Sequence, residues 1–418
     1  MSPLIQYFKQ IWTLPYAVRL FLISESFLGI GQGIFSLLFN LHLLALHVDE
    51  SQIGKITAVG TVVMGIGSIS ISYFIDQWGR KRTLLTGVLL IGAGSSGVAL
   101  GSELLHFYMA YGVYSFGLAM LVASEFSLLF MYCETKQQET LSYSMVFAVF
   151  TLFVGLGTYI GGILPKYLGT GVTTYQVPIL LTGGIIFLVF ATRLFLPKEI
   201  RKTPAPGERK KTKWVPSTNV FIFTGFSIFL GASFALLVPF FNIILKYRLT
   251  LQDDQVALLL TLNGLVLFFS SLFSPFFLEK WGLRKTTMII FLTTVVPSFI
   301  LGLALPLSLF VMVFLFRSGV FTALQNVLEG QMMQATPDED RSIYAGMRSL
   351  GRSMASSVMS LITGYILLVK NYYLPFVLSG AILALGYFYF QYLVLPRLEQ
   401  SDSEAQLKNS SATEEVTL

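Results

Sequence analysis

The chain has 418 residues, of which 54% are hydrophobic, 14% are aromatic and only 12% are charged. A soluble protein usually has about 25% charged residues, so 22 acidic and 28 basic side chains cannot coat a water-soluble fold of this length. The composition therefore excludes a soluble globular enzyme and indicates helices that are solvated by lipid.

Apolar runs bounded by charged residues, Pro or Gly predict twelve membrane-spanning helices. Lys9 and Arg19 precede the first run, and no small-residue cleavage site follows, so we expect this span to be retained rather than removed as a signal peptide. In chain order, the expected helices are 17–45, 52–74, 83–101, 105–131, 142–165, 176–196, 218–246, 254–277, 286–306, 308–333, 343–369 and 373–396.

Charge divides the chain into two halves. Residues 197–217 are rich in Lys and Arg and contain four prolines, which predicts a cytoplasmic basic linker between a bundle at 1–196 and a bundle at 218–396. Residues 397–418 are polar and acidic, which predicts a disordered cytoplasmic tail. With both termini in the cytoplasm, 22 of the 28 basic residues lie inside, five lie outside and Arg317 lies within the membrane, as the positive-inside rule favours.

Several kinds of chemistry have no residues to support them. The net charge of +6 comes from short turns and the linker, so we interpret it as a topology signal and expect no nucleic-acid partner. The single cysteine, Cys133, excludes an internal disulfide and indicates a buried neutral thiol. The three histidines lack the spacing of metal ligands, and no ATP-binding motif or nucleophile elbow is present. We therefore expect no enzyme activity, metal or cofactor.

The two halves repeat each other. Gly29 and Asn40 match Gly231 and Asn242 at an offset of 202, and Asp76-Gln77-Trp78-Gly79 matches Glu279-Lys280-Trp281-Gly282 at an offset of 203. Because six helices separate the copies, both halves have the same orientation. The expected fold class is all-α integral membrane, with two pseudo-symmetric six-helix bundles about an axis along the membrane normal.

The segment from Ser72 to Arg82 resembles the G-x-L-x-D-R-x-G-R-K/R loop of the major facilitator superfamily, a family of secondary transporters with twelve helices. Asp76, Gly79, Arg80 and Lys81 fit the pattern, whereas Ser72, Phe74 and Gln77 depart from it. The resemblance implies a cytoplasmic gate, in which Asp76 meets the start of the eleventh helix near residues 342–348. By the repeat, Glu279 is expected to face the start of the fifth helix near Ser142. The loop could instead merely set topology. The predicted gate residues are Asp76, Gly79, Arg80, Lys81, Glu279, Gly282 and Arg284.

Polar residues within the spans are candidates for function, because charges in lipid are expensive and usually face a cavity. In the first helix, Glu25, Gly29, Gln32, Ser36 and Asn40 recur every three or four residues and form one stripe, which we expect to line a central cavity. Glu25 is the preferred proton-coupling residue; the alternative is a structural Glu that is hydrogen-bonded to a neighbouring helix.

Further candidates lie in the fourth and tenth helices. Glu125 and Glu329 could titrate during transport or simply extend to water. Arg317 needs an anion, which could be a substrate or another acid of the protein. Arg348 and Arg352 could line the inner vestibule or anchor the topology. The substrate-cavity candidates are Gln32, Ser36, Asn40, Asn242, Arg317, Gln325 and Asn326.

Residues 157–162 resemble the G-P-x-x-G-G end of the antiporter motif of drug exporters, although Thr158 stands where proline is expected. Close helix packing by small residues explains this pattern equally well. We hypothesise a secondary transporter of the bacterial cell membrane that moves a small organic solute by alternating access through proton-coupled efflux, as an antiporter. It is expected to act as a monomer. The alternatives are uptake or uniport of an anionic metabolite or sugar, and a non-transporting receptor or scaffold.

Overall fold

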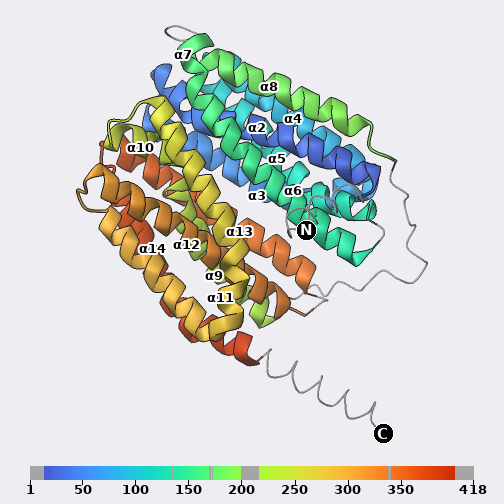
Figure 1. The fold of residues 1–418 in the computed structure, drawn as a ribbon, viewed down its shortest axis with the longest axis vertical. Helices are drawn as coiled ribbons and strands as arrows, with labels where there is room; N and C mark the ends of the chain where they lie inside the picture. Colours follow the sequence, from blue (N-terminus) through green and yellow to red (C-terminus); the bar gives the residue numbers. More distant parts are fainter. Residues whose placement is uncertain are drawn as a thin grey trace, which may run out of the picture. The chain divides into compact units, whose positions relative to one another are not determined.

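The computed structural model describes residues 14–133, 135–168, 171, 173–198, 216–337 and 340–400. This part of the chain contains helices and turns and no strand (Figure 1). The helices are α2 Tyr16–Ala45, α3 Glu50–Trp78, α4 Arg80–Leu100, α5 Leu104–Met131, α6 Lys136–Ile163, α7 Pro165–Leu168, α8 Thr173–Leu194, α9 Thr218–Ala235, η1 Val238–Phe240, α10 Phe241–Arg248, α11 Asp253–Leu301, α12 Leu307–Gln334, α13 Arg341–Leu368, α14 Leu374–Tyr389 and the π-helical turn η2 Phe390–Val394.

Local sequence sets where several helices begin. The Asp49 carboxylate accepts a hydrogen bond from the Gln52 amide at 2.8 Å, and the Thr135 hydroxyl accepts one from the Gln138 amide at 3.2 Å. These side chains satisfy amides that have no partner within the helix, so α3 and α6 each start with a capped turn.

The seventh expected helix is broken rather than continuous. The range 218–246 divides into α9, the 3₁₀ turn η1 and α10. Pro239 lies within η1, and a proline has no amide hydrogen and clashes with the preceding helical turn, which explains the break.

Two glycines make the sharp turns that the repeat predicts. Gly79 has φ 86° and ψ 162°, and Gly282 has φ 72° and ψ 168°. Only glycine readily adopts this backbone region. The equivalent glycines therefore have the same conformation, and each joins two helices with a single residue where a longer loop was expected.

Ten helical segments of the described residues are long and apolar enough to cross a membrane. Two further long helices, α3 with 29 residues and α13 with 28, are less apolar. Many large apolar side chains on the helices are exposed, among them Phe187 and Met312. These faces suit a lipid solvent, and the helix count is consistent with twelve spans.

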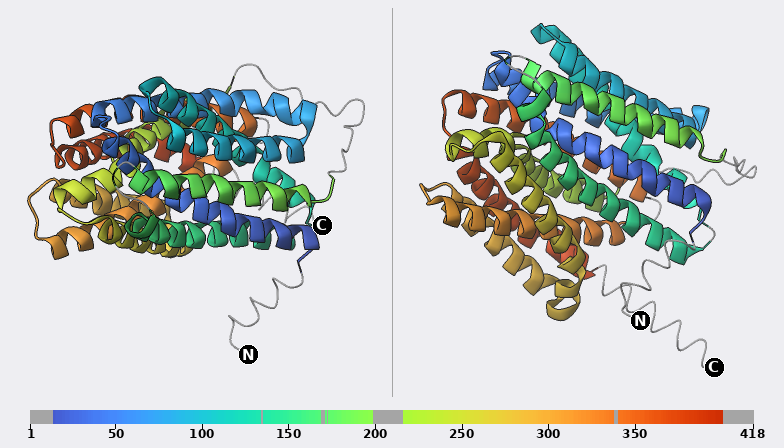
Figure 2. Two further views of the ribbon diagram at one scale, coloured as in Figure 1. Left: turned by 90° about the horizontal axis from the view of Figure 1, so that it is seen from above. Right: turned by 45° about the horizontal axis from the view of Figure 1, so that its top comes forward.

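The helices form two compact units. Unit 1 comprises Met1–Thr203, Val238–Phe268 and Ser360–Tyr372, and unit 2 comprises Pro204–Leu237, Phe269–Met359 and Tyr373–Leu418. Within unit 1, α2 packs on α6 and α8, and α4 packs on α5 and α8 (Figures 1 and 2). Within unit 2, α14 packs on α9, around an aromatic core that includes Phe226, Phe291 and Phe390.

The units differ from the predicted halves at two places, because residues 238–268 and 360–372 group with the first half of the chain. Asn40 on α2 and Asn242 on α10 show one reason: the Asn40 amide donates to the Asn242 side-chain oxygen at 2.9 Å, and the Asn242 amide donates to the Leu37 carbonyl at 2.7 Å. The division of the chain at the linker stays a prediction.

Candidate functional site

A buried cluster of charged side chains lies in unit 1, and we name it the Glu25–Glu125–Arg193 cluster. Arg193, in the last turn of α8, forms ion pairs through Nη2 with Glu25 on α2 and, at 3.2 Å, with Glu125 on α5. Its Nε donates to the Ser24 hydroxyl at 3.0 Å, and its guanidinium stacks on the Phe21 ring at 4.7 Å. Three helices therefore meet around one guanidinium.

This cluster has two carboxyl groups and one guanidinium. Arg193 is 0% exposed, Glu25 1% and Glu125 7%, so water contributes little to stabilising their charges. With both carboxyl groups ionised, the cluster has an excess negative charge, which is costly in a buried site. One proton on either carboxyl group makes the cluster neutral, so the arrangement can hold and release a proton.

The sequence interpretation did not identify Arg193 as a site residue. It counted Arg193 among the basic residues of the cytoplasmic side and gave it no partner, whereas the structure buries its side chain completely between Glu25 and Glu125. Glu25 and Glu125 were recognised as acids within the membrane, and a buried acid requires a cation. An arginine in the last turn of an otherwise apolar helix was the sequence feature that could have identified this partner.

The polar stripe on α2 divides between two environments. Gln32 is half-buried and donates to the Tyr114 hydroxyl at 2.6 Å, while Ser36 is exposed. Asn40 is buried and also donates to the Pro239 carbonyl at 2.6 Å. Gln32 and Ser36 are therefore the accessible members of the stripe, and Asn40 joins α2 to η1 and α10.

Aromatic rings lie next to Gln32 on α2 and α5. The Phe35 ring lies 4.4 Å from that of Tyr114, and the Phe39 ring lies 4.5 Å from that of Tyr111. The centroids of the two tyrosine rings are 5.6 Å apart. Phe35, Phe39 and Tyr114 are buried and Tyr111 is half-buried, so these rings pack α2 against α5 inside unit 1.

Arg317 lies in unit 2, on α12, and is also buried. Its Nε donates to the Ser298 hydroxyl at 2.8 Å and its Nη2 donates to the Ser379 hydroxyl at 2.7 Å. Its guanidinium lies 5.3 Å from the centre of the Phe321 ring. None of the described carboxylates forms an ion pair with it, so its observed partners are neutral hydroxyl groups.

The other candidates on α12 differ in exposure. Glu329 pairs with Arg348 at 3.0 Å and with Arg352 at 2.6 Å, both on α13. Gln325 is half-buried, whereas Asn326 is exposed and donates to the Ser271 hydroxyl at 2.9 Å. Glu329 is thus a paired carboxylate with two arginine partners.

The predicted gate is only partly described. The Asp76 and Glu279 side chains lie outside the described part of the structure. Arg80 donates to the Met131 sulfur at 2.7 Å, and Lys81 donates to the Leu194 carbonyl at 2.9 Å, at the end of α8. Lys81 therefore neutralises a helix C-terminus. Gly282 makes the turn described above, and Arg284 is exposed.

Ion pairs link segments of unit 1 at the predicted outer ends of the helices. Glu50 accepts from Lys370 at 2.5 Å, and this hydrogen bond raises the pKa of Lys370. Lys166 pairs with Asp254 at 2.7 Å and Lys246 pairs with Asp253 at 2.5 Å. These are sequence-distant contacts that sequence reasoning did not identify.

The small residues of α6 pack against neighbouring helices. A Cβ atom at Gly157 would lie 2.2 Å from the Ile30 carbonyl oxygen of α2, and one at Gly162 would lie 2.2 Å from the Ala257 Cβ of α11. Thr158 donates to the Val154 carbonyl at 2.9 Å within α6. Close helix packing therefore accounts for this pattern.

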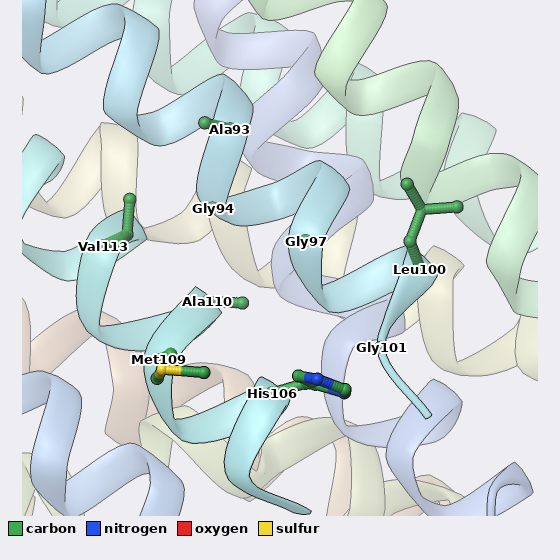
Figure 3. Close-up of a pocket in the computed structure, with 9 residues that line it drawn as sticks. All are labelled: Ala93, Gly94, Gly97, Leu100, Gly101, His106, Met109, Ala110 and Val113. Carbon is green, nitrogen blue, oxygen red and sulfur yellow. The ribbon is translucent and has the colours of Figure 1, made fainter. Parts of the chain in front are cut away.

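A shallow pocket lies between α4 and α5 (Figure 3). Its lining contains no Asp, Glu, Lys or Arg: Ala93, Gly94, Gly97, Leu100, Gly101, His106, Met109, Ala110 and Val113. None of the predicted site residues contributes to it. Among the described residues, no group of three or more His, Cys, Asp or Glu side chains gathers in a way that could hold a metal ion.

Cys133 lies in the turn between α5 and α6. It is half-buried, and its sulfur lies 3.4 Å from the Ser142 hydroxyl oxygen. Burial raises the pKa of the Cys133 thiol, which favours the neutral form that the sequence predicted, but the side chain is half-buried rather than buried.

Comparison with known proteins identifies the family. The sequence model of the Major Facilitator Superfamily matches residues 21–251 and, in a second match, residues 221–416. The chain belongs to the major facilitator superfamily. Each half matches separately, as expected for a chain of two repeated six-helix segments.

The relatives of this chain within the superfamily are named for different kinds of substrate. Multidrug resistance protein 1 of Bacillus subtilis (strain 168) is 24% identical over 356 residues, which cover 82% of this chain and 87% of that protein. The inward open structure of the xylose transporter XylE from E. coli is 13% identical. The match covers 92% of this chain and 99% of the XylE chain, with a TM-score of 0.73. A point mutant of the nucleoside transporter NupG is 12% identical; the match covers 90% of this chain and 100% of that one, with a TM-score of 0.70.

These similarities support the coarse classification. The protein is a multi-pass membrane transporter of the major facilitator superfamily rather than an enzyme. The structural neighbours share its fold at identities too low to transfer a substrate.

Proposed function

We propose that this transporter exchanges protons for a small organic solute by alternating access, and that the direction is export from the cytoplasm. The Glu25–Glu125–Arg193 cluster carries the proposal, because it contains one more carboxyl group than cation at a fully buried position. Glu25 remains the preferred coupling residue, with Glu125 as its partner.

The coupling has a simple electrostatic basis. While the cluster is sealed, a proton on Glu25 or Glu125 removes an uncompensated charge from a low-dielectric site. Release of that proton becomes favourable only when water reaches the cluster or a conformational change brings another cation close to it. A solute that stabilises the water-accessible conformation therefore promotes proton release, which couples the two movements.

The direction rests on a weaker similarity. One relative is named as a multidrug resistance protein. Residues 157–162 of α6 resemble the end of an antiporter motif, and the same residues also serve close helix packing. We place the protein in a bacterial plasma membrane with both termini in the cytoplasm, as the positive-inside rule favours.

Proteoliposomes with an internal pH-sensitive dye test the coupling. A proton gradient is imposed, and amphipathic cations, sugars and organic anions are added in turn. We expect solute-dependent proton flux with the native protein and flux at background level with Glu25→Gln, because the amide cannot exchange a proton.

Glu103→Gln is the matched control, since Glu103 is an exposed carboxylate at the start of α5. It should leave the flux unchanged. Flux that survives Glu25→Gln but vanishes with Glu125→Gln would move the coupling role to α5. Solute transport without any proton movement would contradict the proposal and favour a uniporter or a sodium-coupled carrier.

Arg317 supports a second candidate, uptake or uniport of an anionic metabolite or sugar. Its partners on α11 and α14 are serine hydroxyl groups, which leave its positive charge uncompensated. This alternative would be favoured over export if organic anions compete with the solute for uptake and this competition disappears in Arg317→Gln.

A further inference from the structure

Unit 2 contains a second charged group, which we name the Arg348–Glu329–Arg352 site. Each carboxylate oxygen of Glu329 on α12 accepts a hydrogen bond from one arginine of α13. Arg348 Nη1 donates to Oε2 at 3.0 Å, and Arg352 Nη1 donates to Oε1 at 2.6 Å. Two guanidinium groups share one carboxylate, so the site has an excess positive charge.

The site is open to solvent rather than sealed. The side chains of Arg348, Glu329 and Arg352 are 27%, 24% and 29% exposed. Arg352 is eleven residues from the start of α13, which places it about 16 Å along the helix. Glu329 lies five residues before the end of α12, about 8 Å along that helix. Exposed charges are costly in hydrocarbon, so we expect the exposed side of the site to face water.

The surroundings combine an aromatic ring with polar groups that lack partners. The Arg352 guanidinium lies 5.5 Å from the centre of the Phe234 ring of α9. The Gln325 Nε2 atom, one turn before Glu329, and the Thr224 hydroxyl of α9 are buried and have no hydrogen-bond partner among the described residues. Thr224 packs beside Gly351, the neighbour of Arg352 in sequence.

These groups have a common chemistry. Guanidinium, amide NH₂ and hydroxyl groups all donate hydrogen bonds, and Arg presents several donors in a planar fork that matches an oxyanion. Glu329 occupies only one Nη atom of each arginine. A carboxylate, sulfonate or phosphate group can therefore bind beside Glu329 or displace it.

We propose that the Arg348–Glu329–Arg352 site binds the oxyanion of an amphipathic organic anion, with Arg352 as the main anchor and Phe234 as its apolar support. This inference rests on the proposed function and narrows its substrate class. Glu329 acts as an internal competitor that occupies the arginines while no solute is bound.

Equilibrium binding to the full-length protein in nanodiscs of phosphatidylcholine tests the proposal without a proton gradient. The probes are aromatic acids, each paired with its neutral amide; 1-naphthylacetate and 1-naphthylacetamide are one such pair. We expect the acids to bind at least about tenfold more tightly than their amides, the effect of one charge-assisted contact. Equal binding of acids and amides would overturn the proposal.

The variants separate the roles of the three residues. Arg352→Gln should reduce acid binding by about tenfold and leave amide binding unchanged. Glu329→Gln should strengthen acid binding, because it releases both arginines; a weakened affinity would show that Glu329 is not a competitor and would contradict the proposal. Lys285→Gln, which removes an exposed cation from α11 of the same unit, is the matched control.

Two further arms complete the test. Arg352→Lys retains the charge without the planar fork, so it should fold and bind acids with intermediate affinity. Nanodiscs with phosphatidylglycerol distinguish the source of the oxyanion: acid binding that no longer differs between the native protein and Arg352→Gln in anionic lipid would assign the site to a lipid phosphate and overturn the solute proposal. The binding measurement uses no proton gradient, so its outcome is independent of the flux assay. Acid binding can be absent while Glu25-dependent proton flux persists, and acid binding can be present while that flux is absent.

Discussion

At the scale of single residues, the environment of Arg193 decides how its neighbours behave. Its guanidinium contacts Glu25, Glu125, Ser24 and the Phe21 ring, and its side chain is fully buried. The two acids are therefore neither isolated nor exposed to lipid. Their shared cation explains how two carboxyl groups can be accommodated within one apolar bundle.

Replacing Arg193 alone should lower the free energy of unfolding far more than neutralising all three residues of the Glu25–Glu125–Arg193 cluster. Arg193→Met leaves two buried carboxyl groups without a cation, and we expect a loss of about 3–5 kcal/mol in stability. The triple variant with Glu25→Gln and Glu125→Gln should recover most of that loss. Thermal unfolding in detergent micelles measures both, with Glu103→Gln as the control. If Arg193→Met unfolds at the same temperature as the native protein, the expected role of the cation is contradicted.

At the scale of elements, the repeat is most visible in two turns. Gly79 joins α3 to α4, and Gly282 joins the two parts of α11 with nearly the same φ and ψ. Nothing lies within 4 Å of a Cβ atom placed at Gly282, so steric crowding does not explain the glycine there. Backbone conformation alone requires it.

Gly282→Ala should therefore lower stability by about 1–3 kcal/mol through backbone strain. Gly264→Ala provides a matched control on the same helix, since it also has open space around the added methyl group but an ordinary helical backbone. That variant should be neutral or slightly stabilising. The midpoints of thermal unfolding compare the two; equal midpoints would show that the positive φ imposes no cost.

At the scale of the whole molecule, unit 1 includes segments from both halves of the chain. Asn40 and Asn242 connect α2 to α10, and Lys370 connects the segment after α13 to Glu50 at the start of α3. Glu50 is buried while most of the Lys370 side chain is exposed. The alternating access proposed above requires such contacts to break and re-form during transport.

Lys370→Gln should loosen this contact. An exposed partner contributes up to about 1 kcal/mol, so we expect hydrogen exchange in residues 50–60 and 360–372 to become up to about fivefold faster. Hydrogen–deuterium exchange with mass spectrometry measures the change. Lys280→Gln, an exposed lysine of unit 2, should leave both segments unchanged. Unaltered exchange in Lys370→Gln would show that the ion pair does not hold these segments together.

The sequence by itself determined the lipid environment, the helical class, the internal repeat and the family, because composition, hydropathy and local motifs are encoded in neighbouring residues. It also identified Glu25, Glu125 and Glu329 as acids within the spans. Only the tertiary structure decided their partners. Arg193 and Glu25 are 168 residues apart, and Arg352 and Glu329 lie on different helices. A charge in an apolar helix requires a partner, but which residue supplies it depends on how the helices pack, which local pattern does not specify.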